Sequence, residues 1–431
     1  IRICGGLLLI SYICRRHPMF LSRKHKTIIR ANSLSRLAWQ RLRKNKTAAA
    51  SMILLLLALI VSLLGYLITP DHSPSANTQL PEIAAAKPGF SVSMIRLTKN
   101  EEAEQTGFLQ RMIYGERYPY TLIPVDTFFF EEDKIVAREY SGTLPPTGRE
   151  IRLNLADVAF PLLNGTSPVM DQHQQLRFTT ADGHIRVMKL DDLRELVSNE
   201  HVTKKTFVLG TDRYGRDLLS QLMIGTRVSL SVGFISVIIS LLLGMLLGSM
   251  AGFFRGWVDQ ALMWFINVVW SIPTLLLVIA ITFALGKGFW QVFIAVGLTM
   301  WVEVARVVRG QILGLREKEY VEAGKALGFR SARIIFKHVM PNVTGAVIVI
   351  SAANFASAIL IEAGLSFLGI GVQPPTPSWG AMIRDHYAYV ILDSPHLAIF
   401  PGLAIMLMVL AFMLIGNGLR DALDVRYVEK G

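Results

Sequence analysis

Six long runs of apolar residues divide the chain into segments that are expected to cross a membrane. These runs cover residues 48–69, 228–254, 258–286, 289–308, 341–363 and 397–419. Each is long enough to span about 30 Å of hydrocarbon as a helix. Pro273 lies inside the third run, where neighbouring helices can satisfy the carbonyl group that a proline leaves free. The pattern predicts an all-α polytopic membrane protein with six transmembrane helices.

Residues 70–205 break this pattern between the first and second runs. They hold fifteen Lys or Arg against nineteen Asp or Glu. Residues 175–179 and 185–188 alternate apolar and polar side chains around Ala181-Asp182-Gly183, which is typical of a β-hairpin. A short helix is expected over residues 191–198. We therefore expect a small mixed α/β insertion, on the extracytoplasmic side, between helices 1 and 2.

The composition agrees with a membrane protein: of 431 residues, 52% are hydrophobic and 18% charged. The net charge of +12 matches the twelve Lys or Arg of residues 1–47, which hold no Asp or Glu. Such a segment is typical of a cytoplasmic tail beside a membrane. Within it, residues 34–44 form an amphipathic pattern that suits a helix on the membrane surface. Nucleic-acid binding is disfavoured, because no interleaved aromatic or zinc pattern accompanies the charge.

The ends of the chain add little chemistry. Cys4 and Cys14 are the two cysteines, so the rest of the chain offers no disulfide framework. Met19 is a candidate initiator, with residues 1–18 upstream of it. Residues 427–431 are expected to form a cytoplasmic tail, as an even number of spans returns the chain to the side of its N-terminus.

The charges of the loops support this topology. The loop expected inside, from Arg306 to Lys337, carries eight Lys or Arg, whereas the loops expected outside, 287–288 and 364–395, carry two. Both termini are therefore expected in the cytoplasm of a bacterium, beneath its inner (plasma) membrane. In the second run, glycines recur every four residues, which favours close contact with another helix. They are Gly244, Gly248 and Gly252.

The longest inner loop, residues 315–340, contains the most informative motif. From Glu322 to Pro341 it reads EAGKALGFRSARIIFKHVMP. Glu322, Ala323, Gly324 and Gly328, with Pro341 beyond them, resemble the EAA loop of binding-protein-dependent ATP-binding-cassette (ABC) importers. Gly324 replaces an alanine of that pattern, and Met340 a leucine. The resemblance implies a short coupling helix that docks in a groove of an ATPase subunit.

The residues themselves suit such a contact. The small Ala323-Gly324 pair allows a partner backbone to approach closely, and Glu322 can pair with a basic residue opposite. Gly328 allows the chain to turn, because glycine accepts positive φ at little cost. The alternative is a cytoplasmic helical hairpin with no partner.

Three further segments, residues 209–217, 362–380 and 400–423, resemble the C-type permease of the dipeptide, oligopeptide and nickel importers. The similarity covers residues 209–426, so residues 206–426 are predicted to be a permease core. Val425 stands where that family usually has proline. The insertion at 70–205 departs from the family's short outer segment.

The resemblance implies that the outer loop containing Gln373, Pro374, Pro375 and Trp379 faces the translocation pathway or the solute-binding protein. Taken alone, these residues also suit a rigid loop, since proline fixes φ. The two membrane carboxylates have structural interpretations. Glu303 and Arg306, three residues apart near the inner end of the fourth span, can meet on one face, so a structural pair or snorkelling is expected in preference to a proton relay, and Glu362 is expected to behave similarly at the outer end of the fifth span.

No catalytic or metal-binding constellation is visible. His173, His184 and His201 lack zinc-ligand spacing and are expected at the surface. No G-x-x-x-x-G-K-[ST] loop occurs, so ATP and Mg²⁺ are expected on partner ATPase subunits, and the chain itself is expected to hold no cofactor and to be no enzyme.

The resemblance thus implies the transmembrane permease of an importer of small peptides or related solutes. Its expected partners are a second related permease, two ATPase subunits, an extracytoplasmic solute-binding protein and membrane lipid, with no nucleic acid. Alternatives are import of nickel chelates or other solutes, and a mechanotransmission subunit that moves an outer domain. Such a subunit typically has four spans and no EAA loop. A gradient-driven transporter would need membrane-embedded ion ligands, of which the spans offer few.

Overall fold

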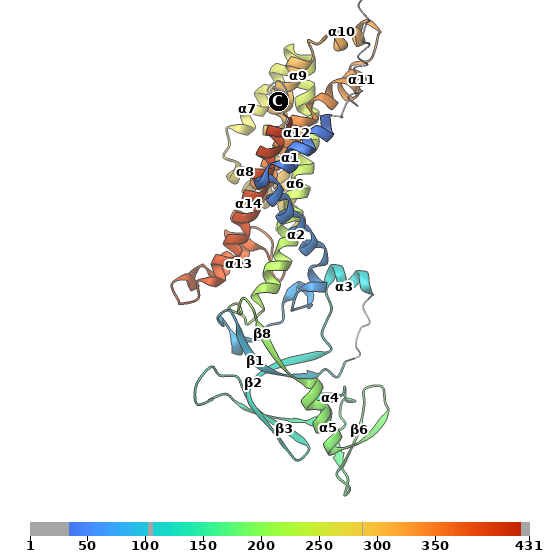
Figure 1. Cartoon of the computed structure of the whole chain (residues 1–431), viewed down its shortest axis with the longest axis vertical. Helices are drawn as coiled ribbons and strands as arrows, with labels where there is room; N and C mark the ends of the chain where they lie inside the picture. The colour runs from blue at the N-terminus through green and yellow to red at the C-terminus, as the bar shows by residue number, and fades with distance from the viewer. Residues whose placement is uncertain (1–33, 102–106, 287, 424–431) are drawn as a thin grey trace, which may run out of the picture.

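The structure is a computed structural model that describes residues 34–101, 107–286 and 288–423. The expectations for residues 1–33, Lys287 and residues 424–431, which include both cysteines, Met19, Val425 and the C-terminal tail, lie outside the described residues. The molecule is elongated, with a bundle of helices at one end and β-strands at the other (Figure 1). We call these the helical and the strand-side ends.

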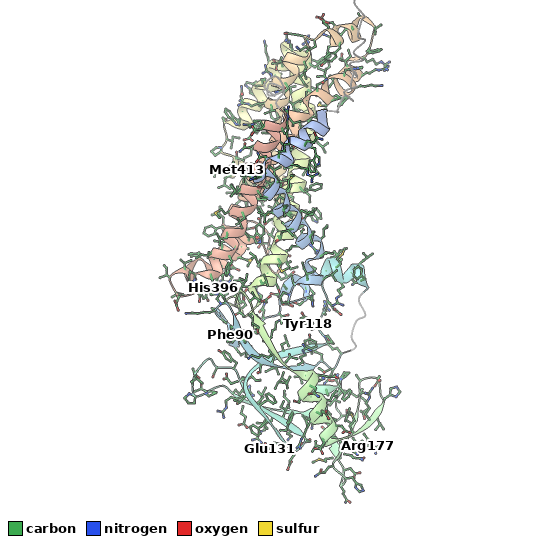
Figure 2. All side chains as sticks on the ribbon, in the orientation of Figure 1. Phe90, Tyr118, Glu131, Arg177, His396 and Met413 are labelled. Atoms are coloured by element: carbon green, nitrogen blue, oxygen red, sulfur yellow. The ribbon has the colours of Figure 1, made fainter. Side chains whose placement is uncertain are left out.

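Within the residues that the structure describes, five helices are long and apolar enough to cross a membrane. They are α2 (Lys46–Ile68), α6 (Leu218–Phe254), α9 (Phe289–Leu315), α12 (Met340–Phe367, continuous with residues from Ser331) and α14 (His396–Leu423). With 37 residues, α6 is about 55 Å long, which exceeds the hydrocarbon thickness, so its first turns reach beyond it. In Figure 2, His396 marks the strand-side end of α14 and Met413 lies further into the bundle.

The third apolar run is not the continuous helix that the sequence suggested. It forms α7 (Gly256–Trp270) and α8 (Thr274–Leu285), which are bent by 90° at a short break. Pro273 sits at this break, where it precedes the first residue of α8. Because proline lacks an N–H and its ring clashes with the preceding turn, the helix stops there instead of bending gently. The described residues therefore contain five or six candidate spans.

The glycine series predicted to mediate helix contact does so between α6 and α9. A Cβ atom on Gly244 would lie 2.4 Å from Val304 Cβ, and one on Gly248 would lie 2.5 Å from the Ala305 carbonyl oxygen. Both distances are far below van der Waals contact. Only glycine lets these two backbones pack so closely, which makes the α6–α9 pair the centre of the bundle.

The remaining helices pack around this pair. Phe355 of α12 stacks on Phe412 of α14 with ring centroids 4.0 Å apart. The expected amphipathic helix is present as α1 (Leu34–Lys44), whose Leu42 is buried against α14 near Gly418. Thus α1 is held to the helical end of the bundle by its apolar side.

The segment between α2 and α6 contains a five-stranded antiparallel sheet in the order β4-β3-β2-β1-β8. Its strands are β1 (Phe90–Thr98), β2 (Tyr120–Glu131), β3 (Lys134–Glu139), β4 (Glu150–Asn154) and β8 (Val202–Phe207). A second sheet joins β5 (Val169–Met170), β6 (Gln175–Thr179) and β7 (Ile185–Lys189). The expected hairpin is β6–β7, and the expected short helix is α5 (Leu190–Leu196), followed by a π-helical turn, Val197–His201.

This α/β unit has its own apolar core. Ile95, Ile135 and Leu155 are fully buried between the large sheet and the helices α4 (Leu155–Ala159) and α5. The strands of the large sheet that come first and last along the chain, β1 and β8, pair with each other. The chain therefore enters and leaves the unit at neighbouring points. This arrangement lets a folded unit be inserted between two helices without separating them.

Candidate functional site

Two of the segments singled out in the sequence meet at the strand-side end of the helices. Residues 209–221 run from β8 into α6 and lie against residues 71–86, which follow α2. The short helix α13 (Trp379–His386) packs beside them. We call these three segments the strand-side clamp. It joins the α/β unit to the helical bundle.

Two glycines allow the clamp to close. Gly210 has φ +82°, and a Cβ atom there would lie 2.2 Å from the Ala86 carbonyl oxygen. Gly215 has φ +73°, and its Cβ would lie 1.7 Å from the Leu80 carbonyl oxygen. Any other residue would be strained in φ and would collide with backbone. The turn expected in this segment therefore forms, and its glycines also let the turn pack closely against residues 71–86.

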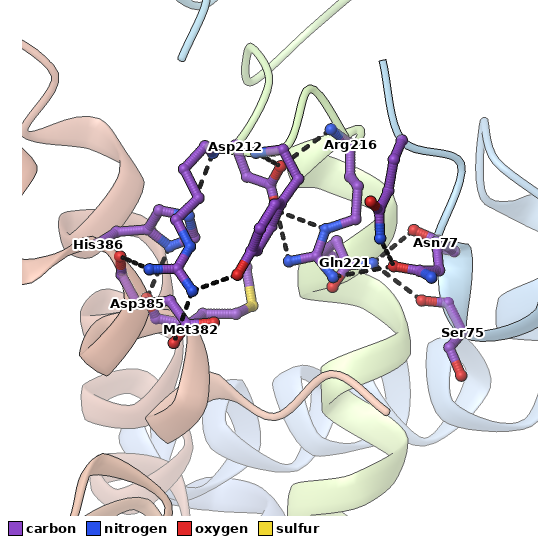
Figure 3. Close-up of polar contacts among 12 residues, drawn as sticks. Ser75, Asn77, Asp212, Arg216, Gln221, Met382, Asp385 and His386 are labelled. Atoms are coloured by element: carbon purple, nitrogen blue, oxygen red, sulfur yellow. Dashed lines mark hydrogen bonds and ion pairs between the residues drawn. The ribbon is translucent and has the colours of Figure 1, made fainter. Parts of the chain in front are cut away.

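Asp212 organises the turn between the two glycines (Figure 3). One carboxylate oxygen accepts hydrogen bonds from the N–H groups of Tyr214 (2.8 Å) and Arg216 (2.9 Å). The other accepts from Arg216 Nε at 2.6 Å. The Asp212 side chain is almost completely buried, so this ion pair is desolvated and bonded on both carboxylate oxygens. Arg216 also donates to Asn77 Oδ1 at 3.1 Å, which ties the turn to the segment after α2.

A buried histidine connects the same turn to α13. His386 is 1% exposed, and its Nε2 accepts a hydrogen bond from the Arg213 N–H at 3.4 Å. Its Nδ1 lies 2.7 Å from the Met382 carbonyl oxygen, so Nδ1 carries the proton and donates to it. These partners suit the neutral imidazole. Burial lowers the pKa of His386, an effect that Asp212 and Asp385 oppose and Arg213 reinforces.

The predicted outer loop lies at this clamp. Pro374 and Pro375 line a cavity of about 240 Å³ together with clamp residues such as Arg213 and Arg384. Gln373 instead donates to the Gly371 carbonyl oxygen of its own loop at 2.8 Å.

Trp379, which follows this loop, is 2% exposed and packs against α6. Its Nε1 donates to the Leu222 carbonyl oxygen of α6 at 3.0 Å, and its ring lies against Gly225. Glu362 is also fully buried, with Ser366 donating to it at 2.7 Å. The expected snorkelling of Glu362 is therefore wrong, because the loop after α12 folds over it.

A second cavity, of about 300 Å³, opens inside the bundle at the break between α7 and α8. Its lining includes Trp270, Thr274, Thr299, Glu303 and Ser357, which come from both sides of the break and from α9 and α12. Glu303 lies near the middle of α9.

The expected pair between Glu303 and Arg306 does not form. Arg306 donates to Asn267 Oδ1 at 2.6 Å and lies over the Trp270 ring, 3.8 Å from its centroid. Both of these partners belong to α7. An aromatic face and an amide on another helix thus replace the carboxylate three residues away, and among the described residues Glu303 has no ion-pair partner.

The predicted coupling segment forms a helical hairpin at the end of the molecule opposite the strands (Figure 1). It consists of α10 (Glu319–Ala326), α11 (Ser331–Ile334) and the π-helical turn Ile335–Val339 that follows α11. Gly328 has φ +73° and ends α10, with its N–H donating to the Lys325 carbonyl and that of Phe329 to the Gly324 carbonyl. The turn predicted at Gly328 is therefore confirmed.

The surface of this hairpin differs in one respect from the sequence interpretation. Glu322 and Ala323 are exposed, but Gly324 is buried, facing Ile334 and Phe329 of its own chain. Gly324 thus serves packing within the hairpin, and only Ala323 of the small pair is open to a partner. Pro341 is exposed in α12, just after the π-helical turn Ile335–Val339, which joins α11 to α12. Leu327 and Phe336 are large apolar side chains that are 72% and 61% exposed.

Sequence reasoning missed several residues that build these sites. Gly210, Gly215 and Asp212 carried a local signal, the turn residues in L-G-T-D-R-Y-G-R-D, but nothing in the sequence identified residues 71–86 as their partner. Trp270 carried a weaker one, as an aromatic residue just before a proline inside an apolar run.

Two family models match separate parts of the chain. Residues 244–429 match the family model described as binding-protein-dependent transport system inner membrane component. Residues 33–88 match the N-terminal TM domain of oligopeptide transport permease C. The five-stranded sheet lies between these two matches.

Among curated proteins, the chain is similar to the glutathione transport system permease protein GsiD of Pectobacterium atrosepticum, with 41% identity over 216 residues. This alignment covers 50% of the chain and 71% of the relative. GsiD of Escherichia coli is 41% identical over 215 residues, with the same coverage. Among solved structures, an inward-facing conformation of the MetNI methionine ABC transporter matches with a TM-score of 0.41 and 16% identity, over 48% of this chain and 98% of that one.

Proposed function

The chain belongs to the dipeptide and oligopeptide branch of the binding-protein-dependent ABC importer permeases, which are multi-pass inner-membrane proteins, and from this premise we propose that it translocates short peptides inward. Glutathione, a tripeptide, is the first candidate solute, because the relatives that share 41% identity are named as glutathione permeases. ATP would be hydrolysed, with Mg²⁺, by partner subunits and not by this chain.

The observation that carries the proposal is the exposed hairpin α10–α11 at the helical end. Its apolar residues Leu327 and Phe336 are uncovered, although burying each would contribute about 1.5–3 kcal/mol. Basic residues surround them, including Arg330, Arg333 and Lys337. A surface that is apolar, basic and stiffened by a helix cap suits a docking contact, and we assign it to the ATPase subunits.

This assignment fixes the orientation of the molecule. The helical end would face the cytoplasm, as the twelve basic residues of the N-terminal segment also indicate. The α/β unit and the strand-side clamp would then lie outside, where the solute-binding protein delivers its cargo. In this arrangement the bent pair α7–α8 is the sixth membrane segment, and both termini lie inside.

Transport would follow from movement of the helical end. When the ATPases close, α10–α11 would be displaced with them and would carry α9 and α12, between which the hairpin is inserted. A second, related permease would supply the opposite wall of the pathway. Alternating access then needs rigid helices that pivot about a central cavity, and the α7–α8 break supplies one.

The test uses the chain purified with its partner subunits. Glu322→Lys and Gly328→Trp should each abolish ATPase docking or the stimulation of ATP hydrolysis by the binding protein, while the protein still inserts. Glu195→Lys makes the same charge change on α5, at the strand-side end, and should leave both unchanged. If the ATPase remains bound and fully stimulated in the two hairpin variants, the proposal fails.

A further inference from the structure

The cavity at the α7–α8 break holds one ionisable side chain, Glu303, among its twelve lining residues. Glu303 lies fourteen residues after Phe289 and twelve before Leu315, and so at the middle of the apolar helix α9. Glu303 also lies five residues before the end of the apolar run 289–308 and three before Arg306, so it is near the inner end of the span, and ionisable residues within spans usually line a pathway or bind a partner.

The surroundings leave this carboxylate without a counterion. The cation nearest along the helix, Arg306, is held by Asn267 and by the face of Trp270. The remaining lining is apolar except for hydroxyl groups, among them Thr299 and Ser357. Glu303 is exposed, so its carboxylate is open to a positively charged group that enters the cavity.

The broken helix adds to this preference. The C-terminal turn of α7, with Val269 and Trp270, forms part of the wall. The carbonyl groups of Asn267, Val268 and Val269 accept hydrogen bonds from Ser271 and Ile272, but the C-terminal end of a helix still carries partial negative charge. Carbonyl ends of discontinuous helices coordinate cations in other transporters. Both features of the cavity therefore select positive charge.

We propose that Glu303 binds the ammonium group of the solute within the membrane, so that the permease itself selects solutes with a free amine. This inference rests on the proposed import of peptides. An ammonium group has three N–H donors, which match the carboxylate and the hydroxyl groups of Thr299 and Ser357. A cavity of about 300 Å³ is large enough for the amino-terminal residue of a peptide.

The cavity contains its own reporter, because Trp270 lines it. The assembled transporter, purified without the binding protein, would be titrated with glutathione and with N-acetylated glutathione while Trp fluorescence is followed. Trp270→Phe should remove the signal. Glu303→Gln should weaken glutathione binding by about tenfold to a hundredfold, the effect of losing a charged hydrogen bond. N-acetylated glutathione should bind the wild type and this variant equally weakly.

Two matched variants separate recognition from structure. Glu317→Gln removes a carboxylate directly after the same helix, outside the cavity, where Glu317 pairs with Arg255, and should bind glutathione as the wild type does. Glu303→Asp keeps the charge and should bind better than Glu303→Gln. Unchanged affinity in Glu303→Gln, equal weakening for both peptides, or no saturable change in the wild type would each overturn the inference.

Uptake into proteoliposomes tests the proposed function separately. ATP and the binding protein would drive uptake of labelled glutathione by the wild type. If uptake occurs but Glu303→Gln binds glutathione normally, the ammonium site is wrong and the importer proposal stands. If the wild type imports no peptide, the proposed function itself fails.

Discussion

The strand-side end and the helical end of the molecule differ in which of their side chains are buried and bonded. At the strand-side end, buried polar groups of the clamp bond to one another: Asp212 accepts on both carboxylate oxygens, and Gln221 Nε2 donates to two carbonyl oxygens, at 2.9 Å to Ser75 and 2.5 Å to Ala76. At the helical end, the hairpin α10–α11 buries only small parts of itself and leaves Leu327 and Phe336 uncovered.

The difference shows which end is complete within one chain. Contacts between residues 71–86 and 209–221 bring together segments that are more than a hundred residues apart, and they hold the α/β unit to the bundle as one piece. The hairpin packs Val321 and Ile334 into an apolar core that it shares with Phe253 of α6, and it leaves Leu327 and Phe336 exposed. The clamp thus holds distant segments together by buried polar contacts, whereas the hairpin keeps part of its apolar surface exposed.

The largest effect is expected from breaking the clamp. Gly215→Ala places a Cβ atom 1.7 Å from the Leu80 carbonyl oxygen, at a φ of +73°. The backbone must move, so we expect a loss of more than about 3 kcal/mol of stability, or no folded protein. Thermal unfolding of the purified chain in detergent measures this.

Its control separates the collision from the φ strain. Gly183 has a similar φ of +81°, but a Cβ atom there meets nothing within 4 Å. Gly183→Ala should therefore lose only about 1 kcal/mol. Equal losses in the two variants would mean that the close approach at Gly215 contributes nothing.

The next effect tests the helical end. Leu327→Ser and Phe336→Ser remove exposed apolar side chains, and each should weaken ATPase docking about tenfold, since an interface would bury them. The unfolding temperature of the chain alone should stay the same. Leu144→Ser changes a residue that is 96% exposed on the α/β unit, and docking should not respond to it. Unchanged ATPase docking in both hairpin variants would contradict the assignment of Leu327 and Phe336 to the docking surface.

The sequence predicted what depends on local pattern. Runs of apolar residues identified the long helices, the four-residue glycine spacing identified the α6 face that meets α9, and Gly328 identified the end of α10. Each of these signals lies within one element, where periodicity and conformational freedom are enough to read it.

Contacts between distant segments were not predictable in the same way. The pairing of Glu303 with Arg306 was expected from their spacing, but Trp270 and Asn267 on another helix bind Arg306 instead. The five-stranded sheet went unrecognised although β1 alternates in its sequence, FSVSMIRLT, and β2 and β3 are joined by a two-residue turn; the pairing of β1 with β8, more than a hundred residues away, leaves no local signal. Burial of Gly324 likewise depends on where α11 folds back.

A smaller effect is expected from pH, and His386 of the clamp contributes to it. In the unfolded chain His386 ionises at its ordinary value of 6.5, whereas burial lowers its pKa in the folded protein. The folded state then binds fewer protons, so stability is complete above pH 6.5 and falls as the pH drops through the folded pKa. Protonated Nε2 would also face the Arg213 N–H as a second donor.

Thermal unfolding between pH 8 and pH 5 measures this dependence. His386→Gln should flatten it relative to the wild type. His184→Gln removes an exposed histidine on the β6–β7 hairpin and should keep the wild-type slope. If the unfolding temperature of His386→Gln depends on pH as that of the wild type does, His386 does not contribute to the pH dependence of stability.

The smallest effect concerns the exposed rim of the same clamp. Lys87 Nζ lies 2.6 Å from Asp393 Oδ2, and both side chains are largely exposed, so water and salt already screen the pair. Lys87→Gln should leave the unfolding temperature unchanged at any salt concentration. This contrasts with the buried pair of Asp212 and Arg216, where Arg216→Gln leaves an uncompensated carboxylate and should destabilise the chain clearly. If Lys87→Gln lowered the unfolding temperature as much as Arg216→Gln does, the exposed ion pair would stabilise the clamp as much as the buried one.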